Sequence, residues 1–223
     1  MRFFDVLGFT NFEEFEKSQP FSEGWPGPAG RVASATRCLT HDLLAGKTRY
    51  CPHMPARHVY DEGTYVHYVT FSCYRRRKLL QSDTCKRIVI GNLSNQLKQQ
   101  NARCVGFVVM NDHVHALVWF PDEHQISLCM DKWKELTSKQ IAATYARCFQ
   151  TYWAALDERE TVWQPRYYDF NIYSERKIHE KLEYMHNNPV RAGFVKDSCD
   201  WTWSSARFWL QGKPVGIPLS WPP

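Results

Sequence analysis

The strongest constraint on the fold is a pair of apolar segments, residues 103–110 and 113–120, separated only by Asn111 and Asp112. Both segments are rich in β-branched and aromatic residues, which favour strands. Asn-Asp is a turn signal, and so short a connection joins neighbouring antiparallel strands. We therefore predict that the two segments form a β-hairpin.

The segments around this hairpin alternate in type. Strand-like composition is found at 65–72 and 163–172, and apolar residues at helical spacing are found at 83–100, 126–149 and 174–187. Ser174 is expected to cap the last helix. The resulting order, β-α-β-β-α-β-α, is typical of a ferredoxin-like, split βαβ sheet. We predict an α+β fold with the helices on one face of the sheet.

Residues 1–53 differ from the rest of the chain. They contain GWPGPAG at 24–30, show little sustained periodicity, and carry six basic and six acidic residues. Met54 then opens a segment that resembles a natural protein start. We predict a functional domain over residues 54–223, preceded by an N-terminal extension that is either mobile or not native to the protein.

Composition narrows the classes of function. A hydrophobic content of 43% supports a packed core, and the net charge of +5, carried by residues 54–223, is compatible with a phosphate-bearing partner. No run approaches the roughly 18 apolar residues of a membrane span, and the chain start does not resemble a signal peptide. The eight cysteines include no C-x-x-C pair, which argues against a zinc knuckle. We predict a cytoplasmic, nucleoid-associated protein with reduced cysteines and no membrane partner.

His113 and His115 are the first candidates for chemistry. Residues at i and i+2 of a strand point the same way, about 7 Å apart, so both imidazoles could reach one metal ion. Val114 would then face the core. The alternative is a pair of half-buried histidines that bind no metal.

Residues 180–195, EKLEYMHNNPVRAGFV, are the second candidate region. Tyr184 and Asn188 are four residues apart and would share one face of a helix. A phenol can attack a phosphate and form a covalent phosphotyrosine, which conserves the bond energy for resealing. The alternatives are that Tyr184 packs in the core and that Asn188 is an N-cap before Pro189.

A phosphoryl-transfer site would need a divalent cation, because negative charge develops on the phosphoryl oxygens and on the leaving 3′ oxygen. Two imidazoles and a neutral amide oxygen suit Mg²⁺ or Mn²⁺, with waters and a phosphate completing the shell. They do not make a closed structural zinc site.

The HVH strand followed by YMHNNPVRAGFV resembles the HUH-type single-tyrosine transposases, in particular their REP-associated branch, whose members carry a motif close to Y-x-H-x-N-P-V-R-A-G. The tracts WQPRYYDF at 163–170 and WTWSSARFW at 201–209 are also similar to that branch. The resemblance spans about Met54 to Trp209.

This resemblance implies an HUH endonuclease-like fold with one nucleophile, Tyr184, and three metal ligands, His113, His115 and Asn188. Related transposases use Gln at the last position, so Glu180 and Glu183 stay open as alternatives to Asn188. The implied activity is metal-dependent cleavage and rejoining of single-stranded DNA near palindromic hairpins, by a monomer or a homodimer.

Basic and aromatic residues suggest where DNA binds, and the predicted contacts are Arg75, Arg76, Arg77, Lys78, Arg166, Tyr167 and Arg191. The four residues that follow the first strand could equally form a solvated face. Arg166 beside Tyr167 joins a charge to a stacking surface, which suits single strands, although an ordinary edge strand would look alike. Arg191 could instead be a helix-cap residue.

Two other functions stay open. The same fold could bind palindromic DNA or RNA hairpins without cleaving them, although such a binder would not need both histidines, the tyrosine and the asparagine. A metal-dependent hydrolase unrelated to DNA would need a second cluster of His and Asp residues, which the chain lacks.

Overall fold

The computed structural model describes residues 65–155 and 161–223, where four strands form one antiparallel sheet in the order β2-β3-β1-β4. The strands are β1 (Val66–Ser72), β2 (Arg103–Val109), β3 (His113–Trp119) and β4 (Tyr168–Ile172). In this order β3 lies between β1 and β2, as in a ferredoxin-like split βαβ sheet. The α+β prediction is confirmed, whereas the predicted extension over 1–53 lies outside the described residues.

The predicted hairpin is formed by β2 and β3. Val109 pairs with Val114, and the turn is closed where the Met110 amide donates to the His113 carbonyl at 2.8 Å. Strand β4 is shorter than predicted and begins at Tyr168. The reason is Pro165, which lacks the amide hydrogen that a strand ladder uses, so the segment before it makes only an isolated bridge at Trp163.

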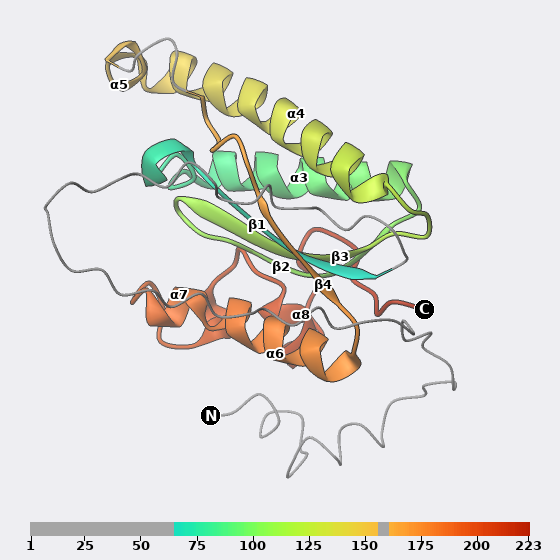
Figure 1. Ribbon diagram of the computed structural model, residues 1–223. Helices are drawn as coiled ribbons and strands as arrows, with labels where there is room; N and C mark the ends of the chain where they lie inside the picture. The colour runs from blue at the N-terminus through green and yellow to red at the C-terminus, as the bar shows by residue number, and fades with distance from the viewer. Residues whose placement is uncertain (1–64, 156–160) are drawn as a thin grey trace, which may run out of the picture. The chain divides into compact units, whose positions relative to one another are not determined.

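Two long helices cover one face of the sheet: α3 (Asp83–Gln99) and α4 (Gln125–Cys148) (Figure 1). Trp133 of α4 joins them, because its indole nitrogen donates to the Val89 carbonyl of α3 at 2.9 Å. Its ring also lies 4.8 Å from the ring of Phe71 on β1, between ring centroids. The main hydrophobic core therefore lies between these helices and the sheet.

Helix α6 (Glu175–His186) lies on the opposite face of the sheet (Figure 1). Ser174 caps it as predicted, accepting a hydrogen bond from the Lys177 amide. Leu182 and Met185 of α6 pack onto β2 at Gly106, where an added Cβ would collide with both side chains. The structure therefore differs from the prediction in one detail: the helices occupy both faces. The inner strands β1 and β3 are buried on both sides along most of their length and therefore need cover on each face.

Short helices complete the described part of the chain: η1 (Tyr74–Arg76), α5 (Gln150–Ala154), α7 (Asn188–Arg191), η2 (Ser198–Asp200) and α8 (Ala206–Gln211). All six cysteines in the described ranges are free thiols. Within the same ranges, none of the helices combines the length and apolarity that crossing a bilayer requires.

Candidate active site

Strand β3 places His113 and His115 on the face of the sheet that α6 covers. Their ring centroids are 4.9 Å apart and the rings are nearly perpendicular, at 86°. Val114 between them is fully buried in the core on the other face, as predicted. The alternation of the strand thus separates a structural valine from two adjacent imidazoles.

His115 is held by two hydroxyl groups of β1. Its Nδ1 lies 2.6 Å from Oγ1 of Thr70 and 2.9 Å from the hydroxyl of Tyr68. The residue is only 7% exposed, and this burial lowers its pKa to about 3, with a smaller contribution from the neighbouring His113. The imidazole is therefore neutral at physiological pH, and a proton on Nδ1 would leave the lone pair on Nε2.

His113 is oriented by the residue before it. Its Nδ1 lies 2.6 Å from Oδ1 of Asp112, and Oδ2 of Asp112 lies 3.0 Å from Nε of Arg76. Arg76 also donates to the hydroxyl of Ser72 at 2.8 Å. Burial lowers the pKa of His113, although Asp112 acts in the opposite direction. Neither histidine has a hydrogen-bond partner at Nε2 among the described residues, so both Nε2 atoms are available as ligands.

Helix α6 brings Tyr184 beside the histidines. The Tyr184 ring centroid lies 6.2 Å from that of His115, and the side chain is 46% exposed. The neighbouring Leu182 and Met185 are buried against the sheet and fix this side of the helix. Its exposure argues against the alternative that Tyr184 is a core aromatic, and it leaves the phenol accessible to a large substrate.

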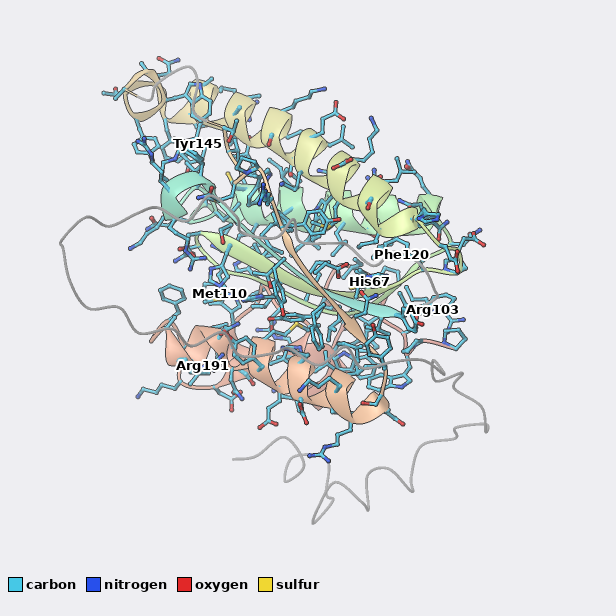
Figure 2. The ribbon with its side chains drawn as sticks, in the orientation of Figure 1. His67, Arg103, Met110, Phe120, Tyr145 and Arg191 are labelled. Carbon is cyan, nitrogen blue, oxygen red and sulfur yellow. The ribbon has the colours of Figure 1, made fainter. Side chains whose placement is uncertain are left out.

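Arg191 links Tyr184 to Asn188. Its guanidinium carbon lies 4.3 Å from the Tyr184 ring centroid, and its Nη2 donates to Oδ1 of Asn188 at 2.5 Å and to the Tyr184 carbonyl at 3.0 Å. Figure 2 shows Arg191 on the α6 side of the sheet, away from Tyr145 on the α4 side. The predicted contact Arg191 therefore lies within the site.

Asn188 is the first residue of α7 rather than its N-cap, which is Asn187. The N-cap alternative for Asn188 is therefore wrong, because the helix begins one residue earlier than the Asn-Pro motif suggests. The Asn188 Nδ2 atom is buried and has no hydrogen-bond partner in the described structure. This side chain is thus a polar group whose hydrogen bonding is incomplete.

The two histidines fit a divalent cation. Their neutral imidazoles present Nε2 atoms without a hydrogen-bond partner among the described residues, whereas Oδ1 of Asn188 accepts a hydrogen bond from Arg191 and would have to exchange it to become a ligand. The alternative ligand Glu180 is engaged with Lys177 and Arg176 instead. Within 65–155 and 161–223, no three His, Cys, Asp or Glu side chains form a metal-binding group, which leaves the Glu180 and Glu183 alternatives without support.

An open groove of about 500 Å³ lies along the exposed side of Tyr184. Its lining residues come from α6 and α7: Glu180, Glu183, Tyr184, Asn187, Val190 and Arg191. The groove and the two histidines thus flank the same tyrosine.

The basic cluster after β1 divides into different roles. Arg76 contacts Asp112 and so supports the site. Arg77 donates to the carbonyls of Tyr74 and Thr161 and so links the segment after β1 to the segment before β4. Arg75 lies 5.3 Å from the Tyr74 ring centroid and is exposed, as is Lys78. The structure therefore brings only one of the four predicted contacts to the histidines.

The second predicted DNA-contacting pair lies elsewhere. Arg166 is exposed, but Tyr167 packs against the hydrophobic core formed with α3 and α4. That core lies on the opposite face of the sheet from His115. The aromatic half of this pair therefore has a structural role, because β4 begins only at Tyr168 and its alternation turns Tyr167 towards the core.

Sequence reasoning missed the groups that orient the histidines: Asp112, Thr70 and Tyr68. An acidic residue directly before a His-x-His strand was a visible signal for Asp112. The two β1 hydroxyls had no local signal, because they meet His115 only through the pairing of β1 with β3, which places Thr70 opposite His115.

The chain is similar to known transposases. A family model described as "Transposase IS200 like" matches residues 61–188. The REP-associated tyrosine transposase of Escherichia coli K12 is 27% identical over 100 residues, which cover 44% of this chain and 51% of that protein. A relative from Haemophilus influenzae is 26% identical over 103 residues, covering 45% and 57%. The chain thus spans about half the length of the curated relatives it matches.

A solved structure of a REP-associated tyrosine transposase bound to a REP hairpin also matches. It superposes with a TM-score of 0.56 at 20% identity and covers 75% of this chain and 93% of that one. This likeness shows a shared fold.

Proposed function

The chain belongs to the IS200-like transposase family, and we propose on this basis that it cleaves and rejoins single-stranded DNA through a covalent bond to Tyr184. Both the E. coli relative and the matching solved structure are REP-associated tyrosine transposases, which supports the same branch. The observation that carries the proposal is the exposed Tyr184 ring 6.2 Å from His115, whose Nδ1 is already engaged.

The proposed reaction has two steps. In the first, the Tyr184 hydroxyl oxygen attacks a backbone phosphorus and the bond from phosphorus to the 3′ oxygen breaks. The phenol loses its proton, and the leaving 3′ oxygen gains one to become a hydroxyl. In the second, a 3′ hydroxyl attacks the phosphotyrosine and releases Tyr184. No external energy source is needed, because one phosphate ester is exchanged for another.

The side chains of the site would have separate roles in this reaction. His113, His115 and Asn188 would hold Mg²⁺ or Mn²⁺, which supplies charge neutralisation at the phosphoryl and leaving oxygens when bound. Asp112, Thr70 and Tyr68 orient the two imidazoles. Arg191, over the Tyr184 ring, offers a guanidinium that suits a phosphate oxygen.

We further propose hairpin-bearing single-stranded DNA as the substrate. One structural relative was solved with a REP hairpin, and the basic residues of this chain fit a phosphate-bearing partner. A palindromic hairpin offers shape to the protein, and the unpaired strand beside it offers a scissile phosphate.

The test is covalent adduct formation. Labelled single-stranded DNA carrying palindromic repeats from the host, incubated with the protein and Mn²⁺ or Mg²⁺, should yield a protein–DNA adduct that survives denaturation. Tyr184→Phe should abolish it. Tyr152→Phe is the matched control, because Tyr152 of α5 is also 46% exposed but lies in another helix. An adduct that persists in Tyr184→Phe would overturn the nucleophile.

The histidines need a separate arm of this experiment. His113→Ala should abolish cleavage while largely sparing DNA binding, because the metal acts on the scissile phosphate rather than on the hairpin. An equal loss of binding would favour direct DNA contact by the histidines. Hairpin binding without any adduct from the unaltered protein would favour the non-catalytic binder.

A further inference from the structure

Lys181 lies three residues before Tyr184 on α6 and projects among aromatic rings. Its Nζ is 4.7 Å from the ring centroid of Tyr68, 5.3 Å from that of Phe170 and 5.9 Å from that of Tyr184. Such a position over ring faces is favourable for an ammonium group and restricts its motion. The cation is therefore held beside the nucleophile and not free in solvent.

Lys181 makes no ion pair within the described part of the chain. The adjacent Glu180 carboxylate is engaged by Lys177 and by Arg176. Asp169 of β4 faces the other side of the sheet, where its carboxylate lies 3.2 Å from Nδ1 of His67. Burial, followed by the like charge of Lys177, lowers the pKa of Lys181. A partly desolvated cation without a carboxylate favours an anionic ligand.

The rings around Lys181 continue to the edge of the sheet. Phe170 of β4 pairs with Tyr68, whose hydroxyl contacts His115, so Phe170 shares the face of the histidines. Strand β4 is an outer strand of the sheet, and Phe170 is 37% exposed. Tyr168 lies two residues earlier on the same face, with its ring 6.5 Å from that of Tyr68. A half-exposed row of rings therefore extends outward from the tyrosine site.

We propose that Lys181 binds a backbone phosphate of the single strand beside the cleaved position, and that Phe170 stacks against a base of that same strand. This subsite rests on the proposed function, since it positions the strand that Tyr184 would attack. An ammonium suits a phosphate as a point charge, and ring stacking tolerates any base. Edge strand β4 thereby becomes part of the DNA path, which the motif residues alone do not indicate.

The test uses the Tyr184→Phe protein, so that binding is measured without cleavage. Lys181→Met keeps the length of the side chain and its packing on the rings but removes the charge. Lys177→Met is the matched control, one turn earlier on α6 and paired with Glu180. For Lys181→Met we expect the salt dependence of single-strand binding to fall by about 0.7 in log–log slope, the value for one phosphate contact. The control should keep its slope.

A second measurement locates the phosphate. Single methylphosphonate substitutions along the strand remove one backbone charge at a time. At one position the substitution should weaken binding when Lys181 is present and have no further effect in Lys181→Met. Phe170→Leu should reduce the quenching of 2-aminopurine placed next to that position, while circular dichroism verifies the fold of each variant.

The outcomes separate the two proposals. An unchanged salt slope in Lys181→Met, or no methylphosphonate position coupled to it, overturns the subsite even if Tyr184 forms an adduct. Coupling at one position supports the subsite even if the unaltered protein forms no adduct, in which case the catalytic proposal fails alone. If one methylphosphonate position is coupled to Lys181 but Phe170→Leu leaves the quenching unchanged, the phosphate contact stands and the stacking half is overturned.

Discussion

Oδ1 of Asp112 lies 2.6 Å from Nδ1 of His113, so the residue that ends the hairpin turn orients the first imidazole of the site. A carboxylate at Nδ1 holds the proton there and leaves the lone pair on Nε2, which is the tautomer a metal ligand needs. Because the other carboxylate oxygen contacts Arg76, the turn after β2 and the segment after β1 are joined at this point.

Asp112→Ala should therefore weaken divalent metal binding. Loss of such a supporting carboxylate typically reduces metal affinity about 10- to 100-fold. Calorimetric titration with Mn²⁺ measures it, and Asp131→Ala, at an exposed position of α4, is the control. Equal affinity of Asp112→Ala and the unaltered protein would contradict the orienting role.

The two hydroxyls at His115 should act as substitutes for each other. Tyr68→Phe and Thr70→Val each leave one oxygen within hydrogen-bond distance of Nδ1, so each alone should change Mn²⁺ affinity little. The double variant leaves a buried Nδ1 without a partner and should lose more than the two single effects combined. Strictly additive losses in the Mn²⁺ titrations would show that the hydroxyls act independently.

Gly106→Ala should disturb the packing that positions Tyr184. An added Cβ would collide with Leu182 and Met185 of α6, and overpacking of this kind costs about 1–3 kcal/mol in the free energy of unfolding. We also expect slower adduct formation, because α6 carries Tyr184. Urea unfolding measures the first effect and adduct kinetics the second.

Gly91→Ala is the matched control for this substitution. Gly91 is exposed in α3 and has open space around an added Cβ, so alanine should raise stability by about 0.5–1 kcal/mol through its better helix propensity. A Gly106→Ala protein as stable and as active as the unaltered one would mean that α6 shifts without cost.

Local patterns were sufficient for much of the fold and for the principal site residues. The β2–β3 hairpin follows from its turn and composition, and the alternation of His113, Val114 and His115 follows from strand geometry. These two features depend on neighbours in sequence, which is why they could be predicted. The start of β4 at Tyr168 also has a local cause in Pro165, but the predicted strand over 163–172 did not take that proline into account.

The remaining features depend on tertiary pairing. Thr70 reaches His115 across 45 residues because β1 pairs with β3 in one particular register. Periodicity could not supply that register.

The placement of α6 opposite α3 and α4 did leave a signal in the sequence, since the nearly continuous apolar runs of β2 and β3 indicate strands buried on both faces. Lys181 lay outside every motif and acquired its role only from the rings around it.

Acid should destabilise the fold through His179 of α6. Burial lowers its pKa to about 4, even though Glu175 lies 3.7 Å from its Nε2, so the folded state favours the neutral imidazole. The unfolded chain binds the proton near pH 6.5. The contribution of neutral His179 to the free energy of unfolding is therefore fully present above about pH 6.5 and is lost as the pH falls towards 4. At pH 5 the loss is on the order of 1–2 kcal/mol.

Urea unfolding of the full chain at pH 7.5 and pH 5 tests this sign. His179→Phe is the informative variant, because a phenyl ring can keep the contact with Trp221, whose ring centroid lies 4.9 Å from that of His179, and does not titrate. It should lose less stability between the two pH values than the unaltered protein. Buried His186 remains in both proteins, with its pKa lowered to about 3, and contributes a shared background. Equal losses in the two proteins would place the acid sensitivity elsewhere than at His179.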